Sequence, residues 1–502
     1  MNGDKSGNSS QSALEPGSNK SHLSTSYAYF GPSEGPLRSL PQRAPITVSP
    51  TTSVRQALMQ MNQVGGDTII VVDTTSELPL GIVTLTDLVH GISVDGGRLD
   101  EPIAGLMTGA PFSLPADAPS HRATVLMTKR GVRHVLLVEP DGRLCNVVSR
   151  SDLFGLRGGG AEALADRVTG AIDVKAMSEA ADAIRKRGAE LFSAGMGVEG
   201  ICQWMSALND LVVMRVIELV EDEFDLPPVP WCWLVFGSEG RLEQTFSTDQ
   251  DNGLLFLPGD ESSTEAIREA FLPFAKAVNR GLDACGFKHC KGGIMSGNPL
   301  WCLSMSEWQE RFSSWMGTPD PEALMHSTIF FDFRPIYGSY ELADNLRNWL
   351  IPLPPERPRF LRAMTEEALT CDPPLNWIGG FVYDGGREHP HSIDLKLHGA
   401  RPFIDAARIW SLTHGIWATN TGDRLRAAAA VQNLKPEETA SEIEAFHLIQ
   451  RFRIQQQLVD MDSDDPNRLD PASLPDLNRL MLKEAFKQAK KLQLRLKLEY
   501  GL

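Results

Sequence analysis

The sequence predicts an α+β protein made of several domains. Its 502 residues exceed what one hydrophobic core needs. One strand-and-helix unit occurs twice near the N-terminus. The rest of the chain combines long patterns of helical spacing with short apolar runs that are typical of buried strands. These observations favour separate domains over one large sheet or helical bundle.

Composition and charge exclude several classes of partner. The formal net charge is −16 and no basic block occurs, which argues against a nucleic-acid partner because Lys and Arg clusters dominate phosphate affinity. No apolar run approaches the length of about eighteen residues that suggests a membrane span, and no signal-peptide pattern is present. We expect a cytoplasmic protein with no membrane partner.

Residues 1–43 are rich in Ser, Gly, Asn and Pro and contain few large apolar side chains. Such a segment buries too little surface to offset the entropy lost on ordering, so we expect a disordered tail.

Residues 44–155 contain the repeated unit. The stretches ITVSP, SVRQALMQMNQVGG, TIIVVD and PLGIVTLTDLVHGI are echoed by FSLPA, SHRATVLMTKRGV, RHVLLVE and GRLCNVVSRSDLFGL. Helical spacing in the second stretch and β-branched runs in the third predict strand, helix, strand, strand and helix in each copy.

This repeat resembles a CBS domain pair, a regulatory module with clefts for adenine nucleotides. The resemblance implies that Thr84 and Ser149 contact phosphate and that Asp87 and Asp152 accept ribose hydroxyls. It also implies an adenine nucleotide as regulatory ligand and association into a homodimer through the pair. A second interpretation is that the Thr and Ser hydroxyls only cap the following helices.

One position departs from this family pattern. The first copy has Gly81, whereas the second has Asn146 where the family usually has Gly. We therefore expect weaker binding in the second cleft.

Proline-rich and glycine-rich stretches divide the remaining chain. GLRGGG begins a helical linker domain, and PPVP and PLPPERP mark two later boundaries. We expect a helical linker domain at 156–224, a domain with a mixed sheet at 225–350 and a helical substrate-binding domain at 351–502.

The stretch WCWLVFGSEGRLEQTFSTDQDNGLLFLPG carries the candidate chemistry. Gly237 and Ser238 follow an apolar strand and open a helix-like insert, where backbone N–H groups suit phosphate oxygens. Asp249 and Asp251 are two residues apart in the next strand, so both carboxylates share one face. Two adjacent carboxylates repel one another, and a hard cation such as Mg²⁺ relieves this.

Gly-Ser, about ten residues and Asp-x-Asp resemble the nucleotidyltransferase superfamily of DNA polymerase β. That resemblance implies two Mg²⁺ ions and a third carboxylate on a neighbouring strand. Asp332 is the candidate, because Phe330, Asp332 and Arg334 alternate on one face of an apolar run. It would ligate a metal or take the acceptor proton. The alternative is an ion pair between Asp332 and Arg334.

A longer pattern includes GGIMSGNPLW, FFDFRPIYG and IDLKLHGARPFIDAARIW. It resembles CBS-containing proteins with a transferase-like domain of the DUF294 type, related to the N-terminal part of protein-PII uridylyltransferase. The resemblance spans residues 45–500 and implies transfer of UMP or AMP from a nucleoside triphosphate to a regulatory protein. No His-Asp dipeptide occurs, so the HD hydrolase domain of the PII-modifying enzymes has no counterpart.

Three basic residues near this motif each allow two interpretations. Arg241 can contact a phosphate or pair with Glu243. Lys396 and Arg401 can meet the triphosphate or pair with neighbouring aspartates.

Two other functions remain open. One is a non-catalytic sensor that binds adenine nucleotide and signals to a partner, and the other is nucleotide transfer to a small molecule.

Overall fold

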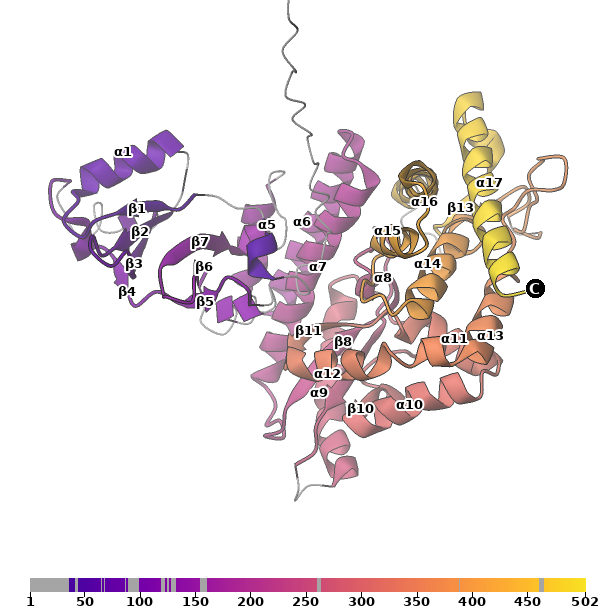
Figure 1. The fold of residues 1–502 in the computed structure, drawn as a ribbon, viewed down its shortest axis with the longest axis horizontal. Coiled ribbons are helices and arrows are strands. Elements are labelled where there is room, and N and C mark those ends of the chain that lie inside the picture. The colour runs from indigo at the N-terminus through magenta and orange to yellow at the C-terminus, as the bar shows by residue number, and fades with distance from the viewer. Residues whose placement is uncertain are drawn as a thin grey trace, which may run out of the picture.

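The computed structural model describes residues 36–40, 44–64, 66, 68–85, 87–88, 99–118, 122–123, 126–127, 132–153, 160–259, 263–387, 389–459 and 465–502. It confirms the α+β class with several domains (Figure 1). The expected tail lies mostly outside these residues. Its last part is packed, because Leu37 is buried and the N–H groups of Leu37 and Arg38 donate to carbonyls of Ala118 and Ala116.

The two N-terminal repeats have the same strand pairing. In each copy a parallel pair is extended by an antiparallel strand. The first copy contains β1 (Ile46–Val48), α1 (Val54–Val64), β2 (Thr68–Val72), β3 (Pro79–Thr84) and the edge strand β4 (Thr108–Gly109). The second contains β5 (Ser113–Pro115), β6 (His134–Val138), β7 (Leu144–Ser149) and α4 (Arg150–Leu153). The first residues of β2 and β6 join the copies, since Thr68 Oγ1 and His134 Nε2 lie 3.1 Å apart.

The two copies differ in how they join the rest of the chain. Buried residues of the first copy form a small core of their own. Buried residues of the second copy belong to one continuous core with the helical segment. That segment comprises α5 (Ala161–Thr169), α6 (Val174–Ser193) and α7 (Val198–Glu221), which lie between the repeats and the central sheet in Figure 1. The second repeat is therefore packed directly onto the helices that lead to the central sheet.

A four-stranded mixed sheet forms the centre of the molecule. Its strand order is β10-β9-β8-β11, with β9 and β10 parallel and the other pairs antiparallel. The strands are β8 (Trp231–Val235), β9 (Asn252–Phe256), β10 (Cys302–Ser304) and β11 (Arg334–Gly338).

Alternate residues of β8 enter different cores. Trp231, Trp233 and Val235 pack with α7 and α9 (Thr264–Ala284), whereas Cys232 and Leu234 pack on the opposite face. Helices of that second face are α10 (Met305–Gly317), α11 (Pro321–Phe330) and α12 (Tyr340–Leu350). Both faces of the sheet are thus covered, which explains the continuously apolar sequence of its strands.

The C-terminal region is helical, as predicted. It contains α13 (Pro358–Ala368), α14 (Arg401–Thr413), α15 (Thr421–Val431), α16 (Pro436–Val459) and α17 (Asp476–Glu499). A short antiparallel pair joins β12 (Ile393–Asp394) to β13 (Arg468–Leu469), and a single π-helical turn, η5 (Leu395–Ala400), leads from β12 into α14. Figure 1 shows α14 to α17 on the side of the sheet opposite the repeats.

In the part of the chain that the structure describes, no helix combines the length and the apolar character needed to cross a bilayer.

Candidate active site

The Gly-Ser turn lies directly against the second aspartate of the motif. Strand β8 ends at Val235, the N–H of Phe236 donates to the carbonyl of Asp251 at 2.8 Å, and α8 (Gly237–Gly240) follows at once. Gly237 has φ of +55°, and a Cβ on it would lie 3.0 Å from Asp251 Oδ2. Only glycine suits both this backbone conformation and this spacing.

The two aspartates precede β9, so their predicted position inside the strand is wrong. Their backbone pairs with a neighbouring loop, since Gln250 donates to the carbonyl of Lys288 and Asn252 to that of Ile294. Gln250 and Asn252 are buried and both bond to the Asn279 side chain. This alternation leaves the side chain of Asp249 exposed and that of Asp251 half-buried.

Asp251 lies in a partly desolvated position. Burial raises the pKa of its carboxyl and the nearby Asp249 adds to this rise, whereas a hydrogen bond from Cys290 and the charge of Lys396 oppose it. Among the described residues no cluster of three His, Cys, Asp or Glu side chains could hold a metal. Two carboxylates do suit Mg²⁺, which is usually held by one or two carboxylates together with substrate phosphates and water.

Asp332 does not have the environment predicted for it. It lies in a turn between α11 and β11, so it does not share a strand face with Phe330 and Arg334. Its side chain is 0% exposed and accepts from Arg241, Arg408 and Arg424 at 2.6–3.0 Å.

These arginines hold the pKa of the Asp332 carboxyl well below its usual range in spite of its burial. Both oxygens are occupied and enclosed, so this geometry contradicts a role as third metal ligand or proton acceptor. The predicted alternative is also wrong, because Arg334 pairs with Asp210 instead.

Arg241 faces the protein interior rather than a phosphate site. It pairs with Glu243 at 2.8 Å and with Asp332 at 2.7 Å, and it is buried. The interpretation as a partner of Glu243 is therefore the one that the structure favours. Glu243 in turn accepts the N–H of Thr421 at 2.7 Å, which ties the loop to the start of α15.

The charge of Lys396 acts on both aspartates of the motif. It lies in η5, where the Asp394 carboxylate accepts the N–H of Lys396 at 2.8 Å. Although the residue is exposed, partial desolvation of its ammonium lowers the pKa of Lys396 and Arg453 adds to this, whereas Asp249 and Asp251 raise it.

Arg401 is engaged elsewhere, in ion pairs with Glu367 and Asp405 at 3.1 Å. Of these two basic residues, only Lys396 lies within the electrostatic reach of both aspartates.

Sequence reasoning missed a buried polar layer behind the Gly-Ser loop. Asp210 of α7 makes two hydrogen bonds to Arg334, which also donates to the carbonyl of Glu239. The Glu239 side chain is 3% exposed, and burial raises its pKa to about 8. Asp210 lies within a long apolar helix, where a carboxylate is unusual. This position is the feature of the sequence that could have indicated a buried polar layer.

The residues predicted for the nucleotide cleft of the repeats form two matching caps. Thr84 donates its N–H and its hydroxyl to the Asp87 carboxylate at 2.8 and 2.7 Å. Ser149 donates in the same way to Asp152 at 3.1 and 2.7 Å. The hydroxyls of Thr84 and Ser149 also accept the N–H groups of Asp87 and Asp152 at 3.3 and 3.1 Å, so both hydroxyls act as caps here. Their contact with a nucleotide stays a prediction.

The space beside Gly81 in the first repeat is filled. A Cβ on Gly81 would lie 2.5 Å from the Met107 sulfur. In the second repeat Asn146 is buried, and its Oδ1 accepts the N–H of Val147. The predicted difference between the two clefts is not tested by these contacts.

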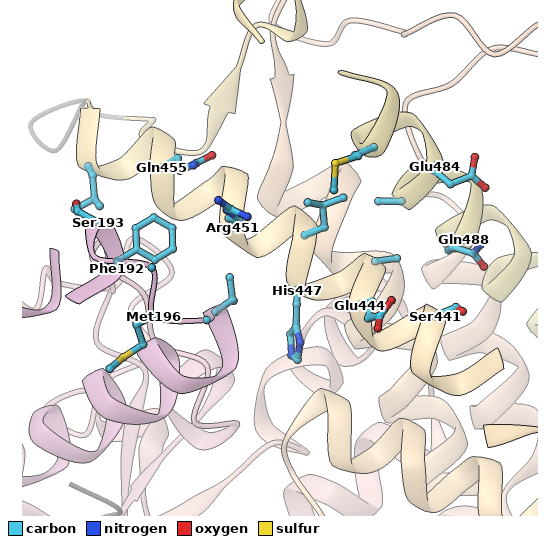
Figure 2. A pocket seen from close by; sticks show the side chains of 18 of the residues that line it. Phe192, Ser193, Met196, Ser441, Glu444, His447, Arg451, Gln455, Glu484 and Gln488 are labelled. Carbon is cyan, nitrogen blue, oxygen red and sulfur yellow. The ribbon is translucent and has the colours of Figure 1, made fainter. Parts of the chain in front are cut away.

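A large cavity of about 1000 Å³ lies elsewhere. Figure 2 shows it between the segment joining α6 to α7 and the helices α16 and α17, with Met196, His447, Arg451 and Glu484 around it. Asp249 and Asp251 do not line it. The proposed site at the two aspartates and this cavity are thus different places in the structure.

Family models match most of the chain in three parts. A model for the CBS domain matches residues 37–94 and 103–158. A model described as "Putative nucleotidyltransferase DUF294" matches 182–322, and one described as "Putative nucleotidyltransferase substrate binding domain" matches 358–500.

Similar curated proteins match only part of the chain. An uncharacterized protein of Methanopyrus kandleri is 30% identical over 114 residues, which are 22% of this chain and 58% of that protein. An uncharacterized 17.7 kDa protein of Acidianus ambivalens is 26% identical over 106 residues, or 21% and 63%. The chain spans less than two thirds of the length of either relative.

Similar solved structures also match about a quarter of the chain. A CBS domain protein from Pyrobaculum aerophilum, complexed with AMP, is 21% identical with a TM-score of 0.22 and covers 23% of this chain and 88% of its own. A CBS-domain containing protein from Agrobacterium tumefaciens is 26% identical with a TM-score of 0.21 and covers 23% and 91%.

Proposed function

We propose that this chain, which combines a CBS domain pair with a DUF294 nucleotidyltransferase domain and its substrate-binding domain, is a regulated Mg²⁺-dependent nucleotidyltransferase. It transfers UMP or AMP from a nucleoside triphosphate to a hydroxyl of a regulatory protein, as the resemblance to PII uridylyltransferase implies. Adenine nucleotide binding to the CBS pair sets its rate, and the pair associates the chain into a homodimer.

One observation carries this proposal. Gly237 brings the start of α8 against Asp251, and the exposed Asp249 stands two residues away. In this proposal the backbone N–H groups of the Gly-Ser turn, including that of Ser238, donate to phosphate oxygens, and the two carboxylates hold Mg²⁺. The proposed phosphate and metal sites thus adjoin where the inner strand β8 ends and the inner strand β9 begins.

The reaction joins the acceptor oxygen to the α-phosphorus and breaks the bond from that phosphorus to the pyrophosphate oxygen. Asp249 and Asp251 would hold Mg²⁺, which would lower the negative charge of the phosphates and favour the deprotonated acceptor. The hydroxyl proton passes to water on the exposed side of Asp249. Positioning by Gly237, Asp249 and Asp251 supplies most of the rate enhancement in such chemistry.

The continuous core between the second repeat and the helical segment supports the regulatory part. Helix α7 belongs to that core, and its Asp210 holds Arg334, which bonds to the Gly-Ser loop at Glu239. A ligand changes activity through different affinity for two states of the protein. Helix α7 thus links the core of the second repeat to the Gly-Ser loop through Asp210 and Arg334.

A non-catalytic nucleotide sensor is the second candidate. The enclosure of Asp332 by three arginines favours it, because the site then has two carboxylates where the polymerase β superfamily uses three.

Incubation with each labelled nucleoside triphosphate, Mg²⁺ and a cell extract separates the candidates. A labelled protein that requires Asp249 and Asp251 supports the proposal. A labelled small molecule indicates a small-molecule transferase. Nucleotide binding without any labelled product, for all four nucleotides, indicates the sensor.

A further inference from the structure

Buried arginines surround the candidate site, and most of them have a carboxylate partner. Arg241, Arg334, Arg408 and Arg424 each form an ion pair with a buried aspartate at 2.6–2.9 Å. Such pairing is expected, because an uncompensated buried charge is strongly unfavourable.

Arg453 of α16 is different. Arg453 is only 6% exposed, yet its side chain donates to the neutral side chains of Asn467 at 2.6 Å and Gln450 at 3.1 Å. Within the described residues it forms no ion pair within 4.0 Å. An arginine stays protonated in a protein, so Arg453 carries a buried positive charge without a direct counter-ion.

The face of α16 that carries Arg453 points toward the aspartate motif. Gln457 lies one turn further along this face, and both side chains bond to Asn467 Oδ1. Gln457 also accepts the N–H of Ser247, two residues before Asp249. The helix is thus held beside the segment that leads into the two aspartates.

A second cation, Lys396, lies in η5, which is bonded to the same residue as Arg453. The N–H of Leu395, next to Lys396, donates to the carbonyl of Asn467 at 3.0 Å, and the Asn467 side chain accepts from Arg453. The charge of Lys396 acts on Arg453, Asp249 and Asp251. Within the described part of the chain the Lys396 side chain has no ion pair and no hydrogen bond. Asp394 contacts Lys396 only at its backbone N–H. Lys396 is exposed, so water solvates its charge, whereas Arg453 is buried. An anion bound between the two cations would offset their mutual repulsion and give Arg453 a counter-ion.

We infer that Arg453 and Lys396 form a polyphosphate site that faces Asp249 and Asp251. The site binds the β- and γ-phosphates of the nucleotide, and this assignment of the anion rests on the proposed function. The planar fork of Arg453 can donate two bonds to phosphate oxygens, and Lys396 adds a point charge. The C-terminal helical region, rather than Arg241 of the Gly-Ser loop, then supplies the cations that neutralise the departing pyrophosphate.

The test measures binding of inorganic tripolyphosphate to the full chain in EDTA by calorimetry. Without Mg²⁺ the aspartates cannot bind tripolyphosphate through a metal ion. The measured binding therefore reports the contribution of the cations alone. The variants are Arg453→Gln and Lys396→Gln. The matched control is Arg451→Gln, which removes the same charge from an exposed position on the same helix, beside the large cavity (Figure 2).

We expect wild-type protein and Arg451→Gln to bind tripolyphosphate equally, and each of the other variants to bind about 10- to 100-fold more weakly, the range for losing one charge-assisted hydrogen bond to phosphate. We also expect the ligand-free Arg453→Gln protein to melt at or above the wild-type temperature, because the substitution removes a buried charge that has no direct counter-ion. If Arg453 had a purely structural role, its substitution would instead lower the melting temperature. Tripolyphosphate should raise the melting temperature of wild type far more than that of this variant.

Unchanged tripolyphosphate binding in both variants, or no wild-type binding at millimolar concentration, would overturn the inference. An Arg453→Gln protein that does not fold would contradict the expected stability, and Lys396→Gln then decides whether the anion site exists. If tripolyphosphate binding depends on Arg453 but the protein transfers no nucleotide, the anion site is supported and only the proposed transfer is contradicted.

Discussion

The clearest prediction concerns Asp332, whose charge holds three arginines in place. In the Asp332→Asn variant the side chain keeps its shape, but Arg241, Arg408 and Arg424 lose their shared anion. Arg241 retains Glu243 and Arg408 retains Asp405, whereas among the described residues Arg424 keeps only the carbonyls of Ala418 and Phe331. At least one buried cation is therefore left without a carboxylate.

The expected cost of that change is large. Breaking a buried ion pair from one side typically costs about 3–5 kcal/mol. For a domain of this size that corresponds to a decrease in melting temperature of about 10 °C. The assay is thermal unfolding at pH 7, with Asp225→Asn as the matched control, because Asp225 is exposed and its substitution removes the same charge.

The pH dependence gives the sign of the effect. The pKa of Asp332 is lowered in the folded protein, so its stabilisation is fully present above the unfolded value of about 4 and is lost as the pH falls below it. The difference between wild type and Asp332→Asn should therefore narrow below about pH 4. An added Arg424→Met should restore part of the lost stability, because it removes the cation without a partner.

An Asp332→Asn protein with wild-type stability would refute this reasoning. If that protein also lost only Mg²⁺-dependent nucleotide transfer, Asp332 would be a metal ligand after all.

Three further predictions concern other parts of the chain. The pKa of Glu239 is raised to about 8 by burial, so the stability it contributes is present below about pH 4 and lost as the pH rises to about 8; Glu239→Gln should raise the melting temperature at pH 9 and have little effect at pH 4.5, and equal shifts at both would show that the carboxyl is not buried. Gly237→Ala should reduce nucleotide transfer at least tenfold and destabilise the protein by about 1 kcal/mol, because φ is +55° and the new Cβ approaches Asp251, whereas Gly259→Ala, where the space is open, should do neither. Asp87→Ala should remove the tighter of the two AMP-binding events in the full chain and the effect of AMP on the transfer rate, which titration calorimetry and rate measurements would check; tight AMP binding equal to wild type would leave Asp87 only as the partner of the Thr84 cap.

Local patterns in the sequence predicted much of the fold. The repeated strands and helices, the helical C-terminal region and the placement of Gly237 next to Asp251 depend on residues close together in the chain, where spacing and turn chemistry determine the structure. The domain boundaries and the roles of the aspartates stay predictions.

The wrong predictions concern ion pairs between residues that lie far apart in the sequence. The run FFDFRPIYG has the alternation of a strand, yet its first residues end α11 and the strand begins at Arg334. Asp332 meets arginines from α14 and α15, and Arg334 meets Asp210 from α7. No local pattern shows which distant charge a buried carboxylate will meet. The same holds for Arg453, whose neighbour Lys396 comes from another element.

The most direct test of the proposed chemistry compares wild type, Asp249→Asn, Asp251→Asn and the control Asp225→Asn for Mg²⁺-dependent transfer of labelled nucleoside monophosphate to the protein acceptor. The two site variants should lose transfer by at least a thousandfold, because they remove carboxylates that hold the metal, and they should melt at or above the wild-type temperature, because their mutual repulsion is relieved. The control should retain full activity. Undiminished transfer by either site variant would contradict the proposed site.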